Sequence, residues 1–443
     1  STHLGHSFPT RRSSDLVYTL FLSWFFCQKV FIGCLHLVYF YINGLIPIVT
    51  LKCRTNERKS EIIMKQHITY IGFYDQLINN TEERKYSLAA TKKMDYVCDA
   101  INELGLSVRI ISPAWSKSSK LKYVKTRKVE VTQDKELILC PTWGSKNKIT
   151  RFLRIIYSLI WLTKWLLINV RENENIIVYH EPWLAIPILV SRLFKKYNLI
   201  LEIEDYYQEV WKTNFIFRKA EKIIFSKCDE CLLVSEVLKE QLNKPEGIVS
   251  YGSYTICTNY KKNIDRRNIK LVFTGGIEKI RGGAYLAVET MKYLPYNYSL
   301  IISGPSGVED KEDIIAAIRV INDILGRTAC KYVGCLADDK YEELLLNSDI
   351  GLNTQKDGDY GSYIFPSKII TYLSHNLRVV STKGISIVKS QVSELIRFAE
   401  GYNPESVAKA IMSIDLTDVY ESIPKLEQLD NEFKQKLGRI IVQ

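Results

Sequence analysis

The segment from Tyr360 to Thr382 constrains the fold most, because it combines a loop, a short helix and a strand in one run. The apolar residues between Ile369 and Leu373 recur at the spacing of a helix face that packs on a sheet. Pro366 suits the first helical position, and Asn376 suits a left-handed helix stop. The β-rich run from Leu377 to Ser381 then predicts a buried strand. The segment therefore predicts an αβ unit of a parallel sheet.

The start of this predicted helix also has the chemistry of an anion site. We expect the backbone amides of Ser367 and Lys368 to face the preceding loop, with the Lys368 ammonium behind them. Such a helix end attracts phosphate, and the dipole alone contributes about 0.3–1 kcal/mol when exposed. An ordinary αβ unit without a ligand is the alternative for this segment.

A second segment, Lys270 to Gly283, favours the phosphate interpretation. It predicts a strand that ends in Gly275 and Gly276, a loop that carries Arg281, and a helix from about Ala284. Glycines at a strand end let the backbone approach a ligand closely. The planar guanidinium of Arg281 suits a diphosphate. Together the two segments predict a diphosphate site at one edge of an α/β sheet.

These segments resemble the nucleotide-sugar domain of the group 1 (family 4) retaining glycosyltransferases. That family has a G-R-x-x-x-x-K-G pattern, which can be set on Gly275. It then places Gly276 at the family's Arg, Arg281 at its Lys and Gly282 at its second Gly. Phe365 to Leu373 is similar to the family's P-S-K-x-x-x-Y-L variant. The resemblance implies that Arg281 and Lys368 stabilise the leaving diphosphate, helped by Ser367.

Two further segments carry the resemblance. Tyr298 to Gly307 is similar to the family's strand with a G-x-G turn. Lys331 to Asn353, which includes Gly334, is similar to the family's base-binding strand and turn. The resemblance covers about Met64 to the C-terminus. It implies an α/β protein of the GT-B type, in which two Rossmann-like parallel-sheet domains face a central crevice.

The domain boundaries follow from the pattern of strands and helices. We expect an acceptor-side domain over residues 64–256, a polar linker over 257–268 and a nucleotide-sugar domain over 269–428. Residues 429–443 predict a C-terminal helix that can return to the first domain. In the first domain we expect strands at Ile68–Phe73 and Val108–Ser112 and a long helix over Thr81–Leu104.

The chain departs from the family at the E-x7-E motif, whose glutamates contact the donor sugar and ribose. Tyr363 and Thr371 stand at those two positions. Their hydroxyls can bind a donor, but more weakly than charged acceptors. The departure supports an alternative in which the chain is a degenerate GT-B scaffold that binds nucleotide without turnover. A second alternative is a nucleotide-sugar epimerase.

The first domain contributes further candidates at its strand ends. His180 follows an apolar strand, and the resemblance implies that it faces the donor sugar; a structural histidine is the alternative. Glu204 and Asp205 follow the next strand and are acceptor-side candidates, or else cap a helix. Gly72 follows the first strand, where the family's glycine-containing loop approaches the donor.

Residues 1–63 resemble a translated sequencing adapter followed by non-coding sequence, so we expect the protein to begin at Met64. The alternative is a signal-anchor at about residues 30–51, where the uncharged run is long enough to span a bilayer. A second apolar stretch, Ile149–Asn169, predicts either a buried helix or a helix that lies at a membrane surface, with basic residues at its border.

Charge and cysteine content narrow the function. The formal net charge is +11 without a dense basic stripe, which argues against nucleic acid. Cys228 and Cys231 form one CxxC without a second pair, a weak signal for a metal. Asp357-Gly358-Asp359 is similar to a metal-binding D-x-D motif, but we expect it to form a solvated turn. We therefore predict no metal and no cofactor beyond a nucleotide-sugar co-substrate.

The combined prediction is a retaining, metal-independent glycosyltransferase in bacterial cell-surface polysaccharide assembly, such as capsule or O-antigen. Its acceptor would be a saccharide or a lipid-linked saccharide. We expect it in the cytoplasm, with peripheral contact at the inner face of the membrane.

Overall fold

The computed structural model describes residues 67–76, 82–206, 215–260, 264–265, 267–356 and 363–442. The expectations for residues 1–63, including the apolar run at 30–51, and for Asp357–Asp359 lie outside these ranges. The fold below belongs to the compact unit that spans residues 65–443.

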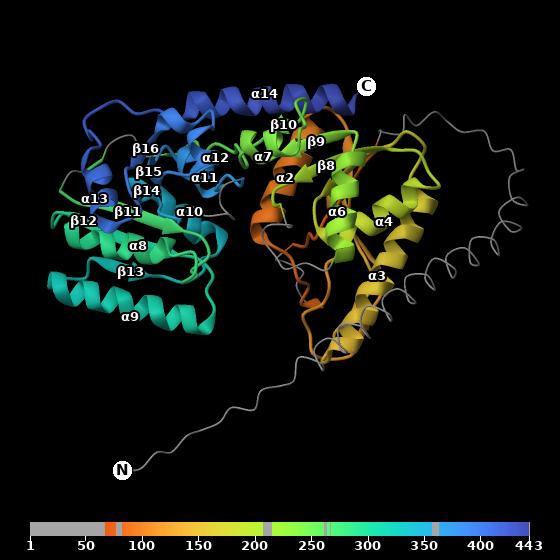
Figure 1. Cartoon of the computed structure of the whole chain (residues 1–443), viewed down its shortest axis with the longest axis horizontal. Coiled ribbons are helices and arrows are strands. Elements are labelled where there is room, and N and C mark those ends of the chain that lie inside the picture. The colour runs from red at the N-terminus through yellow and green to blue at the C-terminus, as the bar shows by residue number, and fades with distance from the viewer. Residues whose placement is uncertain are drawn as a thin grey trace, which may run out of the picture. The chain divides into compact units, whose positions relative to one another are not determined.

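The N-terminal half is built on an eight-stranded sheet (Figure 1). Its order is β10(Ile248–Val249), β9(Glu230–Leu233), β8(Asn198–Ile203), β7(Asn175–Tyr179), β1(His67–Ile71), β2(Ser107–Ser112), β5(Lys135–Leu139) and β4(Arg127–Thr132). All neighbours run parallel except β4 and β5. A separate antiparallel pair joins β3(Tyr123–Val124) to β6(Thr142–Trp143).

Five helices of this half are α2(Leu88–Glu103), α3(Lys148–Asn169), α4(Pro182–Arg192), α6(Phe215–Lys227) and α7(Glu236–Gln241). Of these, α3 contacts α4 and α4 contacts α6. The strands β1, β2, β7, β8 and β9 are almost wholly buried and rich in Ile, Leu and Val, as expected for strands with helices over both faces. The edge strand β4 instead alternates between half-buried and exposed residues.

The C-terminal half is built on a six-stranded, entirely parallel sheet. Its order is β13(Cys330–Tyr332), β12(Tyr298–Ser303), β11(Ile269–Thr274), β14(Ile350–Asn353), β15(Arg378–Thr382) and β16(Ile396–Ala399). Counted along the chain this is 3-2-1-4-5-6, the Rossmann order. Its helices are α8(Gly283–Thr290), α9(Val308–Leu325), α10(Asp338–Leu346), α11(Lys368–Ser374), α12(Ile385–Val388) and α13(Pro404–Met412), with 3₁₀ turns at Met291–Tyr293 and Ser393–Leu395.

The last helix, α14(Ile423–Ile441), connects the two halves. It contacts α11 of the C-terminal half and both α2 and β10 of the N-terminal half, and it is the long blue helix of Figure 1. Tyr96 donates a hydrogen bond to Asp430 at 2.7 Å, and Lys434 forms an ion pair with Glu103 at 2.8 Å. The Asn175 amide donates to the Ile441 carbonyl at 2.7 Å.

Most predicted elements of the two sheets are present, with two corrections at helix starts. The first helix begins at Leu88 rather than near Thr81, because Ser87 is its N-cap and accepts from the Ala90 amide. The predicted placement of Pro366 at the first helical position is wrong, because α11 starts at Lys368 with Ser367 at its N-cap. Asn376 does take the left-handed conformation, with φ of 56°.

The antiparallel hairpin of β4 and β5 was not predicted. Its signal is visible in the sequence, since β-branched and apolar residues alternate with polar ones on both sides of a Gln133–Asp134 turn. The expected alternation of strand and helix concealed it, because an edge strand that folds back replaces one helical crossover.

Candidate functional site: a cationic strand edge in the C-terminal sheet

Three glycines stand where neighbouring strands of the C-terminal sheet end. Gly275 follows β11, Gly304 follows β12 and Gly334 lies two residues beyond β13, all with positive φ. The Gly304 amide donates to the Gly334 carbonyl at 2.9 Å. A Cβ on Gly304 would lie 1.8 Å from the Gly275 carbonyl oxygen, so only glycine fits there. Gly304 was not among the predicted site residues, although its place in the turn similar to the family's G-x-G turn signals this role.

These glycines lie at the point where ligands bind in open α/β sheets. In the Rossmann order, chain direction across the sheet reverses between β11 and β14, and the carboxyl ends of the strands open a space there. α11 packs beside this point, since it contacts β14 and β15. The Tyr372 hydroxyl accepts from the Thr274 amide at 2.8 Å and thereby ties α11 to the end of β11.

Lys368, the first residue of α11, directs its ammonium at this edge. Its Nζ is buried, has no hydrogen-bond partner among the described residues, and lies 3.9 Å from the centre of the Phe273 ring. A Cβ on Gly275 would lie 3.5 Å from Nζ, which places the ammonium against the strand end. Burial, together with the nearby Arg281 charge, lowers the pKa of Lys368 to about 7.

The unpaired ammonium indicates a ligand. A buried charge without a partner is strongly destabilising, and native proteins rarely keep one outside a functional site. An anion at the strand edge would supply the missing partner and reverse the lowering of the pKa.

Arg281 supplies the second cation, from the loop between β11 and α8. Its Nε lies 2.9 Å from the Glu278 carboxylate, and both side chains are about half exposed. Gly282 holds the N-cap of α8 with φ of 66°, and a Cβ there would lie 2.5 Å from the Tyr402 hydroxyl. The neighbouring Gly276 is exposed, and Glu278 is the nearest group to a Cβ built on it. The fold thus brings Arg281, Lys368 and the glycine edge together.

The remaining predicted donor residues surround α11. Ser367 is exposed at the N-cap. The Thr371 hydroxyl donates back to the Ser367 carbonyl at 3.4 Å, a long bond that a ligand hydroxyl can replace. The Tyr363 carbonyl accepts from the Ser235 hydroxyl, and its ring packs edge-on to Tyr206 with centroids 6.3 Å apart. Tyr363 and Thr371 stay candidates for donor hydroxyls.

His180 follows β7, but its ring is buried. Nε2 lies 2.8 Å from the Glu221 carboxylate of α6, and the Phe225 ring packs against the imidazole at 4.8 Å. The His180 amide donates to the Glu202 carbonyl at 2.7 Å. Glu221 was not predicted, because no spacing in the sequence links α6 to β7.

Glu204 belongs to a network of buried charges beyond β8. The Lys93 ammonium lies 3.6 Å from the Glu204 carboxylate and donates to the Ser250 hydroxyl at 2.7 Å. Glu202, two residues earlier, is fully buried and bonds to the Tyr70 hydroxyl. Burial, with the Glu204 charge beside it, raises the pKa of Glu202 to about 7. Sequence patterns missed Glu202 because it interrupts an apolar strand.

The other two N-terminal candidates have simpler settings. Gly72 donates its amide to the Ile111 carbonyl at 3.2 Å, and a Cβ there would lie 2.7 Å from the Met94 sulfur. Close packing against α2 therefore also explains this glycine. Asp205 is partly exposed beside Glu204 and adds to the raised pKa of that residue, for which burial is the main cause.

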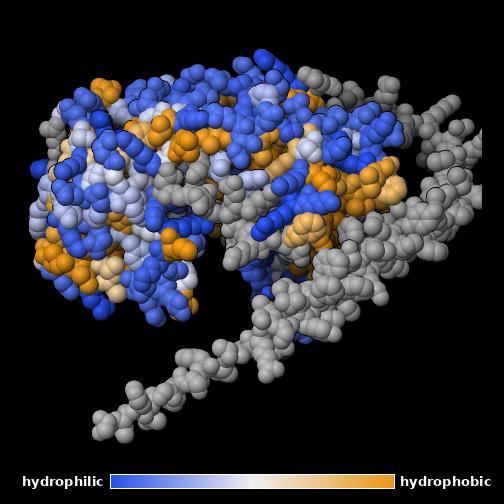
Figure 2. Space-filling view, viewed as in Figure 1, coloured by the Kyte–Doolittle hydropathy of each residue, from blue (hydrophilic) through white to orange (hydrophobic). Residues whose placement is uncertain are grey.

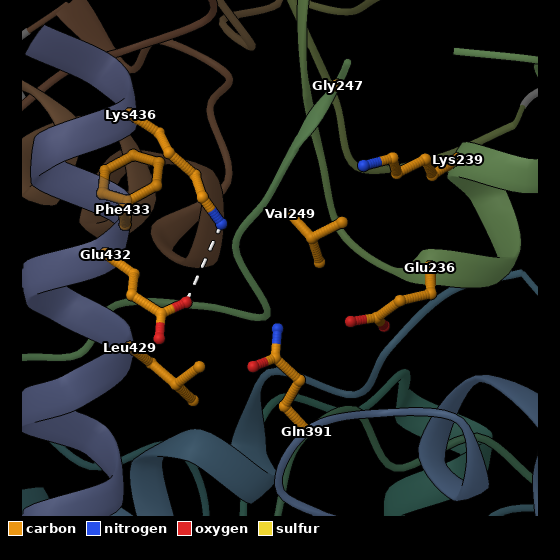
Figure 3. Close-up of a pocket in the computed structure, with 9 residues that line it drawn as sticks. All are labelled: Glu236, Lys239, Gly247, Val249, Gln391, Leu429, Glu432, Phe433 and Lys436. Carbon is orange, nitrogen blue, oxygen red and sulfur yellow. Dashed lines mark ion pairs between the residues drawn. The ribbon is translucent and has the colours of Figure 1, made fainter. Parts of the chain in front are cut away.

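A separate pocket of about 140 Å³ lies between α7, β10 and α14 (Figure 3). None of its lining residues is a predicted site residue, and its Glu432 and Lys436 face each other at 3.7 Å. Its lining residues are Glu236, Lys239, Gly247, Val249, Gln391, Leu429, Glu432, Phe433 and Lys436. The chemistry of an anion site is at the strand edge and not in this pocket.

Only one group of described side chains has the donors and spacing to hold a metal ion: Cys257, Glu342 and His375. It lies at the C-terminal end of α11, because His375 caps that end. Lys368 stands at the opposite end, so the two sites are separate.

Comparison with known proteins establishes the fold. No protein-family model and no curated protein sequence matches the chain. Its structure is similar to that of a trehalose-6-phosphate-related protein from E. coli bound with UDP-2-fluoro glucose. The two align with TM-score 0.61 and 10% identity, over 85% of this chain and 98% of the other.

Two further similar structures are enzymes of sugar-phosphate synthesis. Sucrose-phosphate synthase from Thermosynechococcus elongatus aligns with TM-score 0.59 and 10% identity, over 85% of this chain and 95% of that one. The UDP-forming α,α-trehalose-phosphate synthase from Burkholderia xenovorans aligns with TM-score 0.57 and 13% identity, over 86% of this chain and 100% of that one. At these identities the likeness shows the fold: GT-B, with two Rossmann-like sheets.

The Lys368→Met substitution tests whether the buried ammonium lowers the free energy of unfolding of the ligand-free protein. Met keeps the apolar stem and removes the buried charge, so the ligand-free protein should gain on the order of 1–3 kcal/mol at pH 7. The folded pKa lies below the usual 10.5, so the gain is largest at or below pH 7 and fades as pH rises toward 10.5.

Thermal unfolding of both proteins across this pH range measures the effect. Lys279→Met is the matched control, because Lys279 is exposed on the same loop as Arg281 and paired with Asp313. A loss of stability in Lys368→Met would mean that the ammonium has a protein partner.

Proposed function

We propose that this protein transfers a sugar from a nucleotide-diphosphate sugar to a saccharide acceptor, with retention of configuration and without a metal. The observation that carries the proposal is the buried, unpaired Lys368 ammonium at a glycine edge of a Rossmann sheet. The GT-B fold supports it, and one similar structure holds a UDP-sugar analogue.

In this proposal the diphosphate lies along Gly275, Gly304 and Gly334, where the absence of side chains lets it approach the backbone. Lys368 and Arg281 stabilise the negative charge that develops as the glycosidic bond to the diphosphate breaks. Two fixed cations and backbone amides would carry the charge that a divalent ion neutralises in other transferases. The proposed reaction therefore needs no metal at the diphosphate.

The N-terminal sheet would supply the acceptor side. Glu204 and Asp205, after β8, are proposed to contact acceptor hydroxyls. His180 is held by Glu221, and its proposed contribution is to fix the backbone at the end of β7 beside the donor sugar. The resemblance to family 4 enzymes suggests that the leaving phosphate helps to deprotonate the acceptor on the same face, so no protein base is required.

The acceptor is proposed to be a saccharide or lipid-linked saccharide of a cell-surface polysaccharide. The names of the similar structures point to a phosphorylated sugar as a further acceptor class. Both classes belong in the same acceptor screen, with UDP-, GDP-, dTDP- and ADP-sugars as donors.

Replacing either cation should strongly reduce turnover without unfolding the protein. Loss of one preorganised charge-stabilising group typically costs about 2.7–4 kcal/mol, so Arg281→Ala and Lys368→Ala should each reduce turnover at least about a hundredfold. Lys279→Ala is the control, since it removes an exposed cation from the same loop.

The measurement is product formation with the donor that gives a thermal shift in the unmodified protein. Turnover like that of the unmodified protein in both variants would overturn the assignment. Donor binding without transfer or hydrolysis would identify a degenerate scaffold, and conversion of the donor sugar without an acceptor would identify an epimerase.

Donor binding should take up a proton. Above pH 7 the Lys368 amine of the free protein is mostly neutral, since its pKa is about 7, and a bound diphosphate raises that pKa. Affinity should therefore fall as pH rises from about 7 to 9, by up to about tenfold per pH unit.

Titration calorimetry in buffers of different ionisation enthalpy measures the uptake. The Lys368→Met variant should no longer take up a proton on donor binding, whereas Lys279→Ala should still do so. Arg281→Ala should move the uptake to higher pH, because the Arg281 charge helps to lower the Lys368 pKa. Equal affinity at pH 7 and 9 would contradict the placement of the diphosphate beside Lys368.

The helix α3 is proposed to contact an anionic membrane surface. It is the one described helix that is long and apolar enough to cross a membrane, and only 33% of its apolar stretch is buried. Ile149, Leu153 and Ile160 are exposed within about 40° of one another around the helix. Apolar residues also gather over the neighbouring α4 (Figure 2). Such a face, with Lys148 and Lys164 exposed on the same helix, suits lipid headgroups.

Sedimentation with vesicles that contain phosphatidylglycerol tests this contact. The Ile149→Glu/Leu153→Glu double variant should reduce the bound fraction several-fold, because it places charge where acyl chains would lie. Val320→Glu/Ile324→Glu on α9 is the matched control, since these exposed apolar residues lie on another helix. Equal vesicle binding by the α3 variant and the unmodified protein would exclude α3 as the contact.

A further inference from the structure

A cluster of three potential metal ligands lies where the connection between the two sheets meets the end of α11. Cys257 belongs to the connecting segment after β10, Glu342 to α10, and His375 to the C-cap of α11. One ligand atom from each lies within 4.8 Å of the other two. The Cys257 amide donates to the Ser374 carbonyl at 3.0 Å, which fixes the thiol beside the imidazole.

The backbone determines which nitrogen of His375 can bind a metal. Nδ1 lies 2.8 Å from the Thr371 carbonyl oxygen, and a carbonyl can only accept, so Nδ1 carries a proton. In the neutral ring Nε2 then has the free lone pair. A hydrogen bond from the other ring nitrogen to a backbone carbonyl is the arrangement that orients metal-binding histidines.

His375 Nε2 also lacks a well-aligned partner. The His375 side chain is only 7% exposed, and the Glu342 carboxylate oxygen lies 2.9 Å from Nε2. Yet Nε2 makes no hydrogen bond of acceptable geometry among the described residues. Nε2 and the Glu342 carboxylate are therefore close enough to act as two ligands of one ion.

The distances fit a small tetrahedral ion. Zinc bonds to sulfur at about 2.3 Å and to nitrogen or oxygen at about 2.0–2.2 Å, which places its ligand atoms roughly 3.3–3.7 Å apart. The observed spacings, 2.9 Å between His375 and Glu342 and at most 4.8 Å overall, bracket that range. Rotation of the exposed Glu342 side chain is enough to bring the ligands to these distances.

We propose that Cys257, Glu342 and His375 bind a zinc ion, with water at the fourth position. The mixed sulfur, nitrogen and oxygen donor set suits zinc and disfavours magnesium and calcium, which require oxygen ligands. The ion joins the segment between the two sheets to the end of α11, the helix that carries Lys368 at its other end. Its role is structural and independent of the diphosphate site.

Cobalt(II) and zinc(II) binding to the untagged full chain test the site. Cobalt should give a thiolate-to-metal charge-transfer band and tetrahedral d–d bands at one equivalent per chain, and zinc should displace it. Cys257→Ser should remove the charge-transfer band. His375→Gln should weaken zinc affinity by more than the roughly 10–100-fold typical of losing an outer partner.

Two controls and one further ligand variant keep the test decisive. Cys335→Ser removes an exposed thiol elsewhere and should leave the band unchanged. Cys228→Ser/Cys231→Ser removes the CxxC pair, whose sulfurs lie 3.1 Å apart, and should also leave the band unchanged. Glu342→Gln, at a half-exposed position of α10, should keep the fold and weaken binding even if the buried variants misfold.

The proposal fails if the unmodified protein gives no charge-transfer band, or if the band survives Cys257→Ser in a folded protein. It also fails if the band disappears in the Cys228→Ser/Cys231→Ser variant instead. Zinc should raise the unfolding temperature of the unmodified protein and of Lys368→Ala alike, so the outcome does not depend on the diphosphate site.

Discussion

Parallel pairing of β11 with β12 and β14 is the constraint on which the C-terminal half depends. Because the strands run in one direction, their carboxyl ends meet at one edge, and the chain must leave that edge through tight turns. Glycines at 275 and 304 allow the turns to touch, since a Cβ on Gly304 would collide with the Gly275 carbonyl. The same close approach leaves an edge without side chains, to which a diphosphate can come near.

Buried charges distinguish this edge from the rest of the described protein. In the N-terminal half, Lys93 has the Glu204 carboxylate and two acceptors on Ser250 near it, and His180 has Glu221. Lys368 instead faces an aromatic ring and a second cation, and burial lowers its pKa. We infer that an ammonium held in this way has a partner from outside the chain, and that inference underlies the proposed function.

The short helix α11 links three features of the molecule. Tyr372 anchors it to β11, and Gly351 in β14 makes room for the Tyr372 ring, since a Cβ there would lie 2.3 Å from it. Its first residue is Lys368, and its C-cap is His375. A ligand at the first end and the proposed zinc ion at the other would both restrain the same seven-residue element.

The sequence by itself predicted most of the parallel strands and several residues of the strand edge, but neither the antiparallel strand β4 nor the role of Gly304. The apolar run before Gly275 predicts β11, and the β-rich run after Asn376 predicts β15. Asn376 takes the predicted left-handed conformation after α11, and Gly275, Arg281 and Lys368 are among the predicted site residues. These features are local, because turn chemistry and strand composition act over a few neighbouring residues. The start of α11 was misplaced by two residues, since proline preferences at helix starts are weak determinants of a boundary.

Only the tertiary structure decided which charges are satisfied. Glu221 reaches His180 across 41 residues, and Cys257 meets His375 from another segment of the chain, so no spacing in the sequence indicates either contact. The burial of Glu202 and the missing partner of Lys368 are likewise products of packing. Sequence patterns reveal which groups are present, whereas desolvation and pairing depend on the distant residues that the fold brings beside them.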